Sequence, residues 1–154
     1  MKQTILIMIG LSSLLLADFT KSGDIVTDNI TTLQWQDNSE VNTTTKFWAD
    51  AITYCEGMTL GGFDDWRMPN INELLSIANK NKTTAPAISN VFQFVAYTPN
   101  NLTSYTVLYW SSTTSVDYND RAYTVSFNYG DEIDVYPQME KTKANYFRCV
   151  RGGI

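Results

Sequence analysis

The residues with the clearest potential for acid–base chemistry are two adjacent carboxylates, Asp64 and Asp65. Two neighbouring carboxyl groups can divide the roles of general acid and general base. The 154 residues contain no histidine, so the commonest general base near neutral pH is missing, as is every histidine-activated nucleophile. Adjacent carboxylates in a turn more often cap backbone amides or pair with an arginine, here Arg67. We therefore predict a structural role for the pair and a chain that is not an enzyme.

Calcium binding is the second chemistry that the sequence offers. Oxygen-bearing side chains are concentrated in two short segments, and Ca²⁺ takes 6–8 oxygen ligands, so both segments would have to converge on one ion. Exposed turn acids are usually only solvated, and we predict no cofactor, with calcium as the alternative. The candidate ligands are Asp117, Asn119, Asp120, Asp131 and Asp134.

A binding surface is the third option, because tyrosines gather in the C-terminal half of the chain. Tyrosine combines a broad apolar face with a hydrogen-bonding tip, which suits contact with sugars or protein loops. We expect the ligand surface on the loops at residues 80–101, 116–120 and 130–136. Its candidate contact residues are Tyr118, Asn119, Tyr129 and Tyr136.

The first seventeen residues resemble an export signal. Lys2 precedes an apolar run from Ile5 to Leu16, and Ala17 is a small residue suited to cleavage. The run is shorter than the roughly 20 apolar residues that span a bilayer, so a retained anchor is the alternative. We predict a signal peptide at residues 1–17, a single domain at 18–154 with its core at about 24–152, and no transmembrane span after cleavage.

Composition limits the partners of the exported domain. Loss of Lys2 with the leader leaves ten basic and sixteen acidic residues, a formal charge of −6. Binding to a nucleic acid requires clustered lysines and arginines on one surface, so we predict no nucleic-acid partner. We expect a periplasmic, extracellular or cell-surface location.

Cys55 and Cys149 are the only cysteines. In an oxidising compartment an even pair predicts a disulfide, and two unrelated buried thiols are the alternative. The bridge would close a loop of 95 residues, which corresponds to about 4–5 kcal/mol in a chain-entropy estimate.

The periodicity of the apolar residues predicts helices in the first half of the chain and strands mainly in the second half. This order indicates an α+β fold with two helices on mainly antiparallel strands. The helices are expected at Phe47–Glu56, ended by Gly57 as a C′ residue, and at about Ile71–Asn79, begun by an Asn70–Glu73 capping box. The residues before Asp24 are expected to be a polar lead-in, residues 38–45 a polar loop, and residues 80–101 a long, weakly patterned segment with a short helical turn or a strand at Val91–Val95. The strands are expected at Asp24–Thr27, Leu33–Gln36, Thr106–Ser112, Arg121–Asn128, Glu132–Tyr136 and Tyr146–Arg151.

Residues 61–75 join the two expected helices. Gly61 and Gly62 allow a sharp bend, and a buried tryptophan would anchor the segment. We therefore assign residues Asp64, Asp65, Trp66 and Arg67 to a structural joint.

Six motifs occur in order along the chain. They are GDIVTDNITTLQWQ (23–36), AITYC (51–55), GGFDDWRMPNINELLSI (61–77), YWSST (109–113), AYTVSFNYG (122–130) and YFRCVRGG (146–153). With these motifs the chain resembles the bacterial Lcl C-terminal domain family. The resemblance implies a C-type-lectin-like fold, related to that of the formylglycine-generating enzymes, in which a disulfide commonly ties the first helix to the final strand. Cys55 and Cys149 occupy those two places.

The resemblance also limits the functions that we expect for the chain. Formylglycine-generating enzymes use catalytic cysteines, and both cysteines here are assigned to the bridge, so we rank such an enzyme last. Family members in adhesins recognise sulfated polysaccharides, a ligand that the acidic balance of this chain disfavours. We predict an exported, non-enzymatic module that binds a glycan or an envelope or surface protein. The alternative is a structural envelope protein without a soluble ligand.

Overall fold

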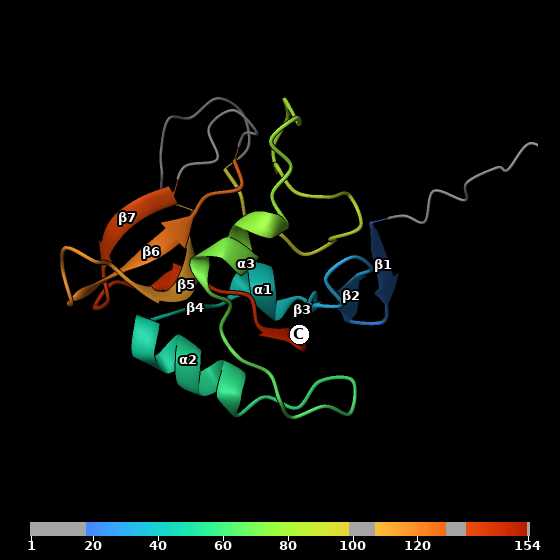
Figure 1. The fold of residues 1–154 in the computed structure, drawn as a ribbon, viewed down its shortest axis with the longest axis horizontal. Coiled ribbons are helices and arrows are strands. Elements are labelled where there is room, and N and C mark those ends of the chain that lie inside the picture. Colours follow the sequence, from blue (N-terminus) through green and yellow to red (C-terminus); the bar gives the residue numbers. More distant parts are fainter. Residues whose placement is uncertain (1–17, 99–106, 129–134, 154) are drawn as a thin grey trace, which may run out of the picture.

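The computed structural model describes residues 18–98, 107–128 and 135–153, with side chains left undescribed at 135–138. These residues form an α+β arrangement of three helices and two sheets (Figure 1). The first sheet has the strand order β1-β2-β3-β9 and the second the order β4-β8-β5-β6-β7. The elements are β1 (Phe19–Ser22), β2 (Ile25–Asp28), β3 (Gln34–Gln36), α1 (Glu40–Thr43), β4 (Thr45–Lys46), α2 (Trp48–Glu56), α3 (Ile71–Ser76), β5 (Tyr109–Thr114), β6 (Arg121–Val125), β7 (Val135–Glu140), β8 (Asn145–Tyr146) and β9 (Val150–Arg151).

The first sheet brings the two ends of the domain together. β1, β2 and β3 form an antiparallel meander, and β9 pairs with β3, placing Trp35 opposite Val150. Both of these side chains are fully buried. The expected polar lead-in before residue 24 is wrong, because it forms β1, whose Phe19 packs edge-on against Phe92.

The second sheet lies between two hydrophobic clusters. In β5, Tyr109 belongs to the cluster that includes Leu74 of α3, while its neighbour Trp110 belongs to the cluster that includes Ala51 and Cys55 of α2. Successive residues of a strand point to opposite faces, so both faces of this strand are covered. In β6 the neighbours Thr124 and Val125 are likewise both buried.

The expected strand at residues 146–151 is wrong as a single element. Tyr146 ends β8 in the second sheet, and Val150 begins β9 in the first. The three residues between them are buried, and the guanidinium of Arg148 donates to the carbonyl oxygens of Gln36 (2.6 Å) and Phe94 (2.5 Å). The chain therefore crosses from one sheet to the other here, and Cys149 lies in the crossing.

Both expected helices are present, with corrected ends. Gly57 caps α2 in a right-handed conformation (φ −91°), not the left-handed C′ conformation. Asn70 and Glu73 form the expected reciprocal capping box at the start of α3. That helix ends at Ser76 because Asn79 donates its N–H to Ala87 (2.9 Å), which draws the chain into the following loop.

A third helix, α1, occupies part of the segment expected to be a polar loop. It is a single turn, and its sequence, EVNT, carries only one buried residue, Val41. One turn is too short for a periodic apolar pattern, so the packing of that residue sets the conformation.

The segment between α2 and α3 is held at three points. The indole of Trp66 is buried (2% exposed) and donates to the carbonyl oxygen of Leu60 at 3.2 Å. The guanidinium of Arg67 makes two hydrogen bonds to Glu73 of α3 (2.8 and 2.6 Å), and its backbone exchanges two hydrogen bonds with Val150 (2.9 and 2.8 Å). The segment thus ties α3 to the last strand of the first sheet.

The two aspartates of this segment do not pair with Arg67. Asp65 accepts hydrogen bonds from the guanidinium of Arg151 (2.5 and 3.1 Å), and that interaction holds the pKa of its carboxyl below its usual value. Asp64 is exposed. The expected pairing of the carboxylates with Arg67 is wrong because Arg67 is engaged by the nearer capping glutamate of α3.

Replacing Trp66 by phenylalanine should destabilise the fold by about 1–2 kcal/mol, because the substitution leaves the Leu60 carbonyl without its donor and opens a small void. Urea denaturation measures the change. Ile30→Ala is the matched control, since Ile30 is 75% exposed and its loss should change the free energy of unfolding by less than about 0.5 kcal/mol. Equal effects for both substitutions would contradict the anchoring role.

Candidate functional site

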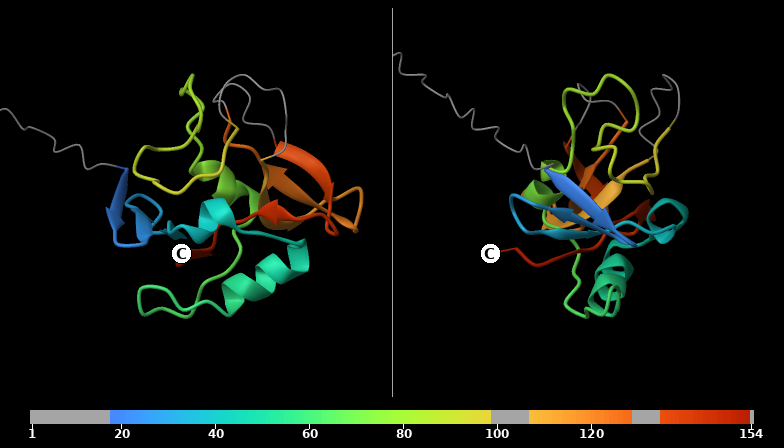
Figure 2. Two further views of the ribbon diagram at one scale, coloured as in Figure 1. Left: turned by 180° about the vertical axis from the view of Figure 1, so that it is seen from behind. Right: turned by 90° about the vertical axis from the view of Figure 1, so that its right-hand side faces the viewer.

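The long segment after α3 is irregular but firmly attached to the domain. Ala87 and Ile88 are buried, and the N–H of Ala87 donates to the carbonyl oxygen of Phe127 at 2.6 Å. Further along, the N–H of Thr98 donates to the side chain of Asn128 at 3.1 Å. We call residues 79–98 the long loop. In Figures 1 and 2 it lies on the side of the molecule opposite α2.

A buried ion cluster fixes the middle of the long loop. The carboxylate of Asp37 is fully buried and accepts the backbone N–H groups of Gln93 (2.9 Å) and Phe94 (3.1 Å). It also pairs with the guanidinium of Arg148 (3.0 Å), itself fully buried, and with the ammonium of Lys21. Burial would raise the pKa of Asp37, but the charge of Arg148 and these hydrogen bonds outweigh it and hold the pKa below 3.8.

Sequence reasoning missed this cluster. Asp37 and Arg148 are 111 residues apart, and neither belongs to a spaced motif for chemistry. Asp37 directly follows Gln36, a buried residue, and Arg148 directly precedes Cys149 of the disulfide. These positions in the sequence were the available signal. A charged residue in such a place needs a partner when buried.

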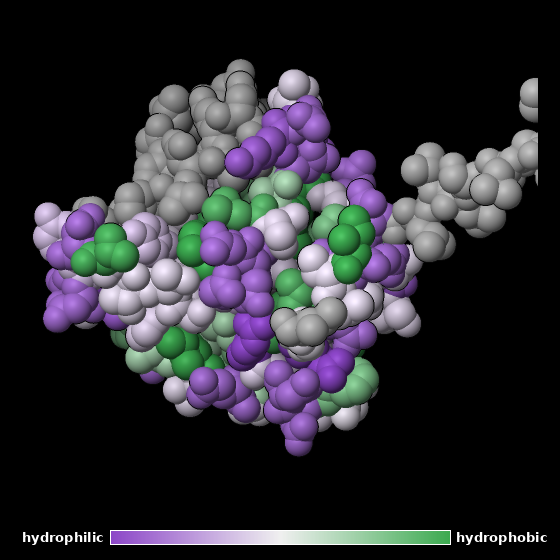
Figure 3. All heavy atoms as spheres, viewed as in Figure 1, coloured by the Kyte–Doolittle hydropathy of each residue, from purple (hydrophilic) through white to green (hydrophobic). Residues whose placement is uncertain are grey.

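Two pockets lie along the long loop. The larger, about 620 Å³, is lined by the start of β1, the end of α3 and residues 79–81, 89 and 91 of the loop. The smaller, about 230 Å³, is formed within the loop, and Ser89 lines both. The face shown in Figure 3 mixes hydrophilic and hydrophobic patches and has no single continuous apolar surface.

The pocket linings offer hydrogen-bonding groups beside aromatic rings. Asn79 and Asn81 contribute amides to the larger pocket, where Phe19 supplies a ring. In the smaller pocket, Lys82 donates to the side chain of Asn90 at 2.7 Å, and Tyr97 presents a ring that is 39% exposed. Amides, hydroxyls and an exposed ring are suited to holding a polyhydroxylated ligand.

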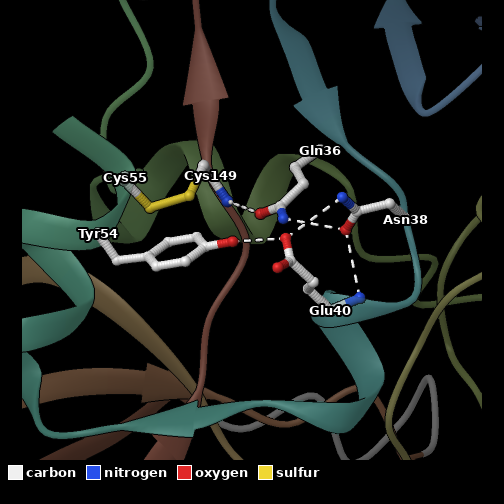
Figure 4. The surroundings of a disulfide bond; sticks show 6 residues. All are labelled: Gln36, Asn38, Glu40, Tyr54, Cys55 and Cys149. Carbon is white, nitrogen blue, oxygen red and sulfur yellow. Dashed lines mark hydrogen bonds between the residues drawn. A yellow bond between two sulfur atoms is a disulfide. The ribbon is translucent and has the colours of Figure 1, made fainter. Parts of the chain in front are cut away.

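A disulfide links α2 to the segment that precedes β9. Cys55 of α2 is bonded to Cys149, with the Cα atoms 5.5 Å apart, which confirms the expected bridge. Beside it, the side chain of Gln36 accepts the N–H of Cys149 (3.2 Å) and donates to Asn38 (3.0 Å) (Figure 4). The hydroxyl of Tyr54 donates to Glu40 in the same group, and burial together with that carboxylate raises the pKa of Tyr54.

The model of the Lcl C-terminal domain family matches residues 24–151. The chain belongs to this family. Searches of curated proteins and of solved structures find no match. Among the residues that the structure describes, no helix is long and apolar enough to cross a membrane.

The residues expected at the ligand surface are only partly described in this Lcl C-terminal domain. Tyr118 and Asn119 lie in the turn between β5 and β6, and neither lines the two pockets. Tyr136 pairs through its backbone with Thr124, and Tyr129 lies outside the described residues. Of the three expected ligand loops, the one at residues 80–101 is where both pockets occur.

The expected calcium ligands are only partly described. Asp131 and Asp134 lie outside the described residues. In the turn that holds the other three candidates, the ammonium of Lys141 donates to the carbonyl oxygen of Asn119 (2.9 Å) and to Thr114 (2.9 Å). Within the described ranges, no three carboxylate, cysteine or histidine side chains are grouped as a metal would require.

Proposed function

We propose that this Lcl C-terminal domain is an exported, non-enzymatic binding module whose ligand is a carbohydrate held in the two pockets of the long loop. The observation that carries the proposal is the lining of those pockets: the amide of Asn79 lines the larger pocket, and the amide of Asn90 and the exposed residue Tyr97 line the smaller one. Sugars bind through hydroxyl hydrogen bonds combined with stacking of their apolar faces on aromatic rings, and these side chains supply both.

We also propose that the domain is C-type-lectin-like in architecture. The disulfide joins the first long helix, α2, to the chain just before β9, as the family resemblance implies. β1 and β9 belong to the same sheet, which joins the two ends of the domain. The long loop carries the pockets and packs on these regular elements. A rigid scaffold of this kind holds an irregular binding loop in place without a ligand.

Export and the lack of catalysis are parts of the same proposal. The apolar leader ending at Ala17 supports secretion, and the Cys55–Cys149 bridge fits an oxidising compartment. The two described linings hold Asp18, Lys80 and Lys82 as charged groups, and neither lining contains a cysteine or a histidine. We therefore assign recognition, not turnover, to this site.

Glycan-array binding of residues 18–154 tests the function. Tyr97→Ala should weaken the strongest glycan interaction at least tenfold, because it removes the stacking face of the smaller pocket. Ile30→Ala, at an exposed position that lines neither pocket, should leave it unchanged.

Chelation of calcium should leave glycan affinity unchanged if the pockets described are the site. A glycan that binds only with calcium would move the site to the acidic turns. Binding of no glycan, with stoichiometric capture of one envelope protein, would contradict the proposal and favour the structural alternative.

A further inference from the structure

The two pockets of the long loop share a wall, which residues 88–93 form. Ser89 lines both pockets, while Val91 lines the larger and Phe92 the smaller. The ring of Phe92 also meets that of Phe19, which lines the larger pocket, with 5.5 Å between the ring centroids. In Figures 1 and 2 the long loop runs from α3 towards β1 and then returns to the body of the domain. The pockets are therefore neighbours, separated by one stretch of chain.

The shared wall is fixed from behind. The N–H of Gln93 donates to the buried carboxylate of Asp37 at 2.9 Å. The guanidinium of Arg148 lies 4.7 Å from the ring centroid of Phe92, and Ile88, at the other end of the wall, is buried. A fixed wall keeps the two pockets at a constant spacing, so one ligand that enters both does not have to order the loop first.

The smaller pocket is too small for a complete ligand of the usual size. Pockets that hold a whole small molecule commonly measure about 300–1,000 Å³. The larger pocket, about 620 Å³, lies within that range, whereas the smaller, about 230 Å³, lies below it. The smaller pocket is therefore suited to one part of a ligand, and the adjoining larger pocket is the nearest place for the remainder.

The charged side chains of the two linings are few and mixed in sign. Asp18 and Lys80 line the larger pocket and carry opposite charges. In the smaller pocket, the ammonium of Lys82 donates to the side chain of Asn90 (2.7 Å) and to the carbonyl oxygen of Ile88 (3.3 Å), so the loop itself uses two of its three donors. Neither lining presents a group of like charges, which favours a neutral ligand over a strongly charged one.

We propose that the two pockets are adjacent subsites for one neutral, linear oligosaccharide, whose chain crosses the shared wall at Ser89 and places sugar units in both pockets. This inference rests on the carbohydrate function proposed above and adds the length and the charge of the ligand. Ser89 is small and half-buried, which suits a crossing point. A unit in the smaller pocket would lie beside Tyr97, and units in the larger pocket would lie beside Phe19. Because the units belong to one molecule, the second contact forms at a high effective concentration and raises the affinity.

A length series tests this inference without any substitution. The protein, purified after expression of the full chain, is titrated calorimetrically with cello-oligosaccharides and with chito-oligosaccharides of one to six sugar units. In at least one of these neutral series the hexamer should bind at least tenfold more tightly than the dimer. The hexamer should bind with a stoichiometry of one per domain, because a single chain fills both pockets.

Substitutions in each pocket and at the wall locate the effect. Tyr97→Ala alters the smaller pocket, and Ser89→Trp places a bulky side chain at the crossing point, so in either variant the hexamer should bind no more than about twofold more tightly than the dimer. Asn81→Ala alters the larger pocket at an exposed position and should weaken dimer and hexamer binding by similar factors. Ile30→Ala, which lies in neither lining, should keep the ratio of wild type.

Three results would overturn this inference and leave the proposed function standing. They are equal affinities for dimer and hexamer in both series, two hexamers bound per domain, and a hexamer advantage that persists in both Tyr97→Ala and Ser89→Trp. Glycan-array binding limited to charged or branched glycans would overturn it in the same way. Binding of no glycan at all would contradict the proposed function, and this inference with it.

Discussion

Asp37→Asn is expected to lower the free energy of unfolding by about 3–5 kcal/mol, because it leaves the buried guanidinium of Arg148 without its counter-charge. The same carboxylate accepts the N–H groups of Gln93 and Phe94, so the middle of the long loop should loosen as well. Urea denaturation reports the first effect. Faster amide hydrogen exchange at these two residues reports the second.

Asp120→Asn is the matched control, since Asp120 is exposed and its replacement should cost less than about 0.5 kcal/mol. A double variant, Asp37→Leu with Arg148→Met, removes both buried charges and should lose less than the sum of the single losses, although the N–H groups of Gln93 and Phe94 then lack their acceptor. Additive losses in the double variant would show that the two charges do not support each other.

The same carboxylate sets an acid limit on stability. Its pKa in the folded state lies below the ordinary 3.8, because Arg148, the backbone N–H of Gln93 and Lys21 together outweigh the effect of burial. The unfolded chain therefore binds the proton more readily. The contribution of Asp37 is complete above about pH 4 and is lost as pH falls through its folded pKa. In Asp37→Asn, the dependence of stability on pH below about 4 should be shallower than in wild type.

Breaking the disulfide is the second substitution with a large expected effect. Cys55→Ala with Cys149→Ala should destabilise the domain by up to about 4–5 kcal/mol, because the unfolded chain loses a cross-link that closes a long loop. Urea unfolding of wild type with and without a reducing agent measures the effect. The double variant should show the lower stability under both conditions, and reductant should not change it further.

Thiol quantification on the native protein gives an independent check. Two free thiols before denaturation would contradict the bridge. Similar midpoints for wild type with and without reductant would show that the bridge forms but constrains little.

Much of the architecture followed from local patterns. Phe47, Ala51 and Cys55 are spaced at four residues, which located α2, and the Asn70–Glu73 pair located the start of α3. These features depend on contacts within a few residues, so the sequence displays them directly. The disulfide followed from counting two cysteines.

Other features depend on contacts between distant segments. The strand pattern at residues 146–151 is continuous in the sequence, yet Arg148 needs partners in Gln36 and Phe94, which makes the chain change sheets. β1 has a polar sequence and is recognisable only through its pairing with β2.

The candidate site was predicted in outline only. The long loop was expected to carry ligand contacts because loops of that length in compact domains are often functional. Its larger pocket could not be foreseen, because it arises where the loop meets β1, which is remote in sequence. Tyr118 was grouped with the other tyrosines by composition, which does not determine where a residue lies in the fold, and it lines neither described pocket.

The pairing of β9 with β3 has a kinetic consequence. The first sheet and the disulfide both need residues 149–151, so neither is complete until those residues have left the ribosome. Long-range strand pairing of this kind also slows folding, because the intervening chain must be ordered first. In the export proposed above, a chain without these late contacts could pass unfolded through a secretion channel, and oxidation of Cys55 and Cys149 after passage would then fix the fold.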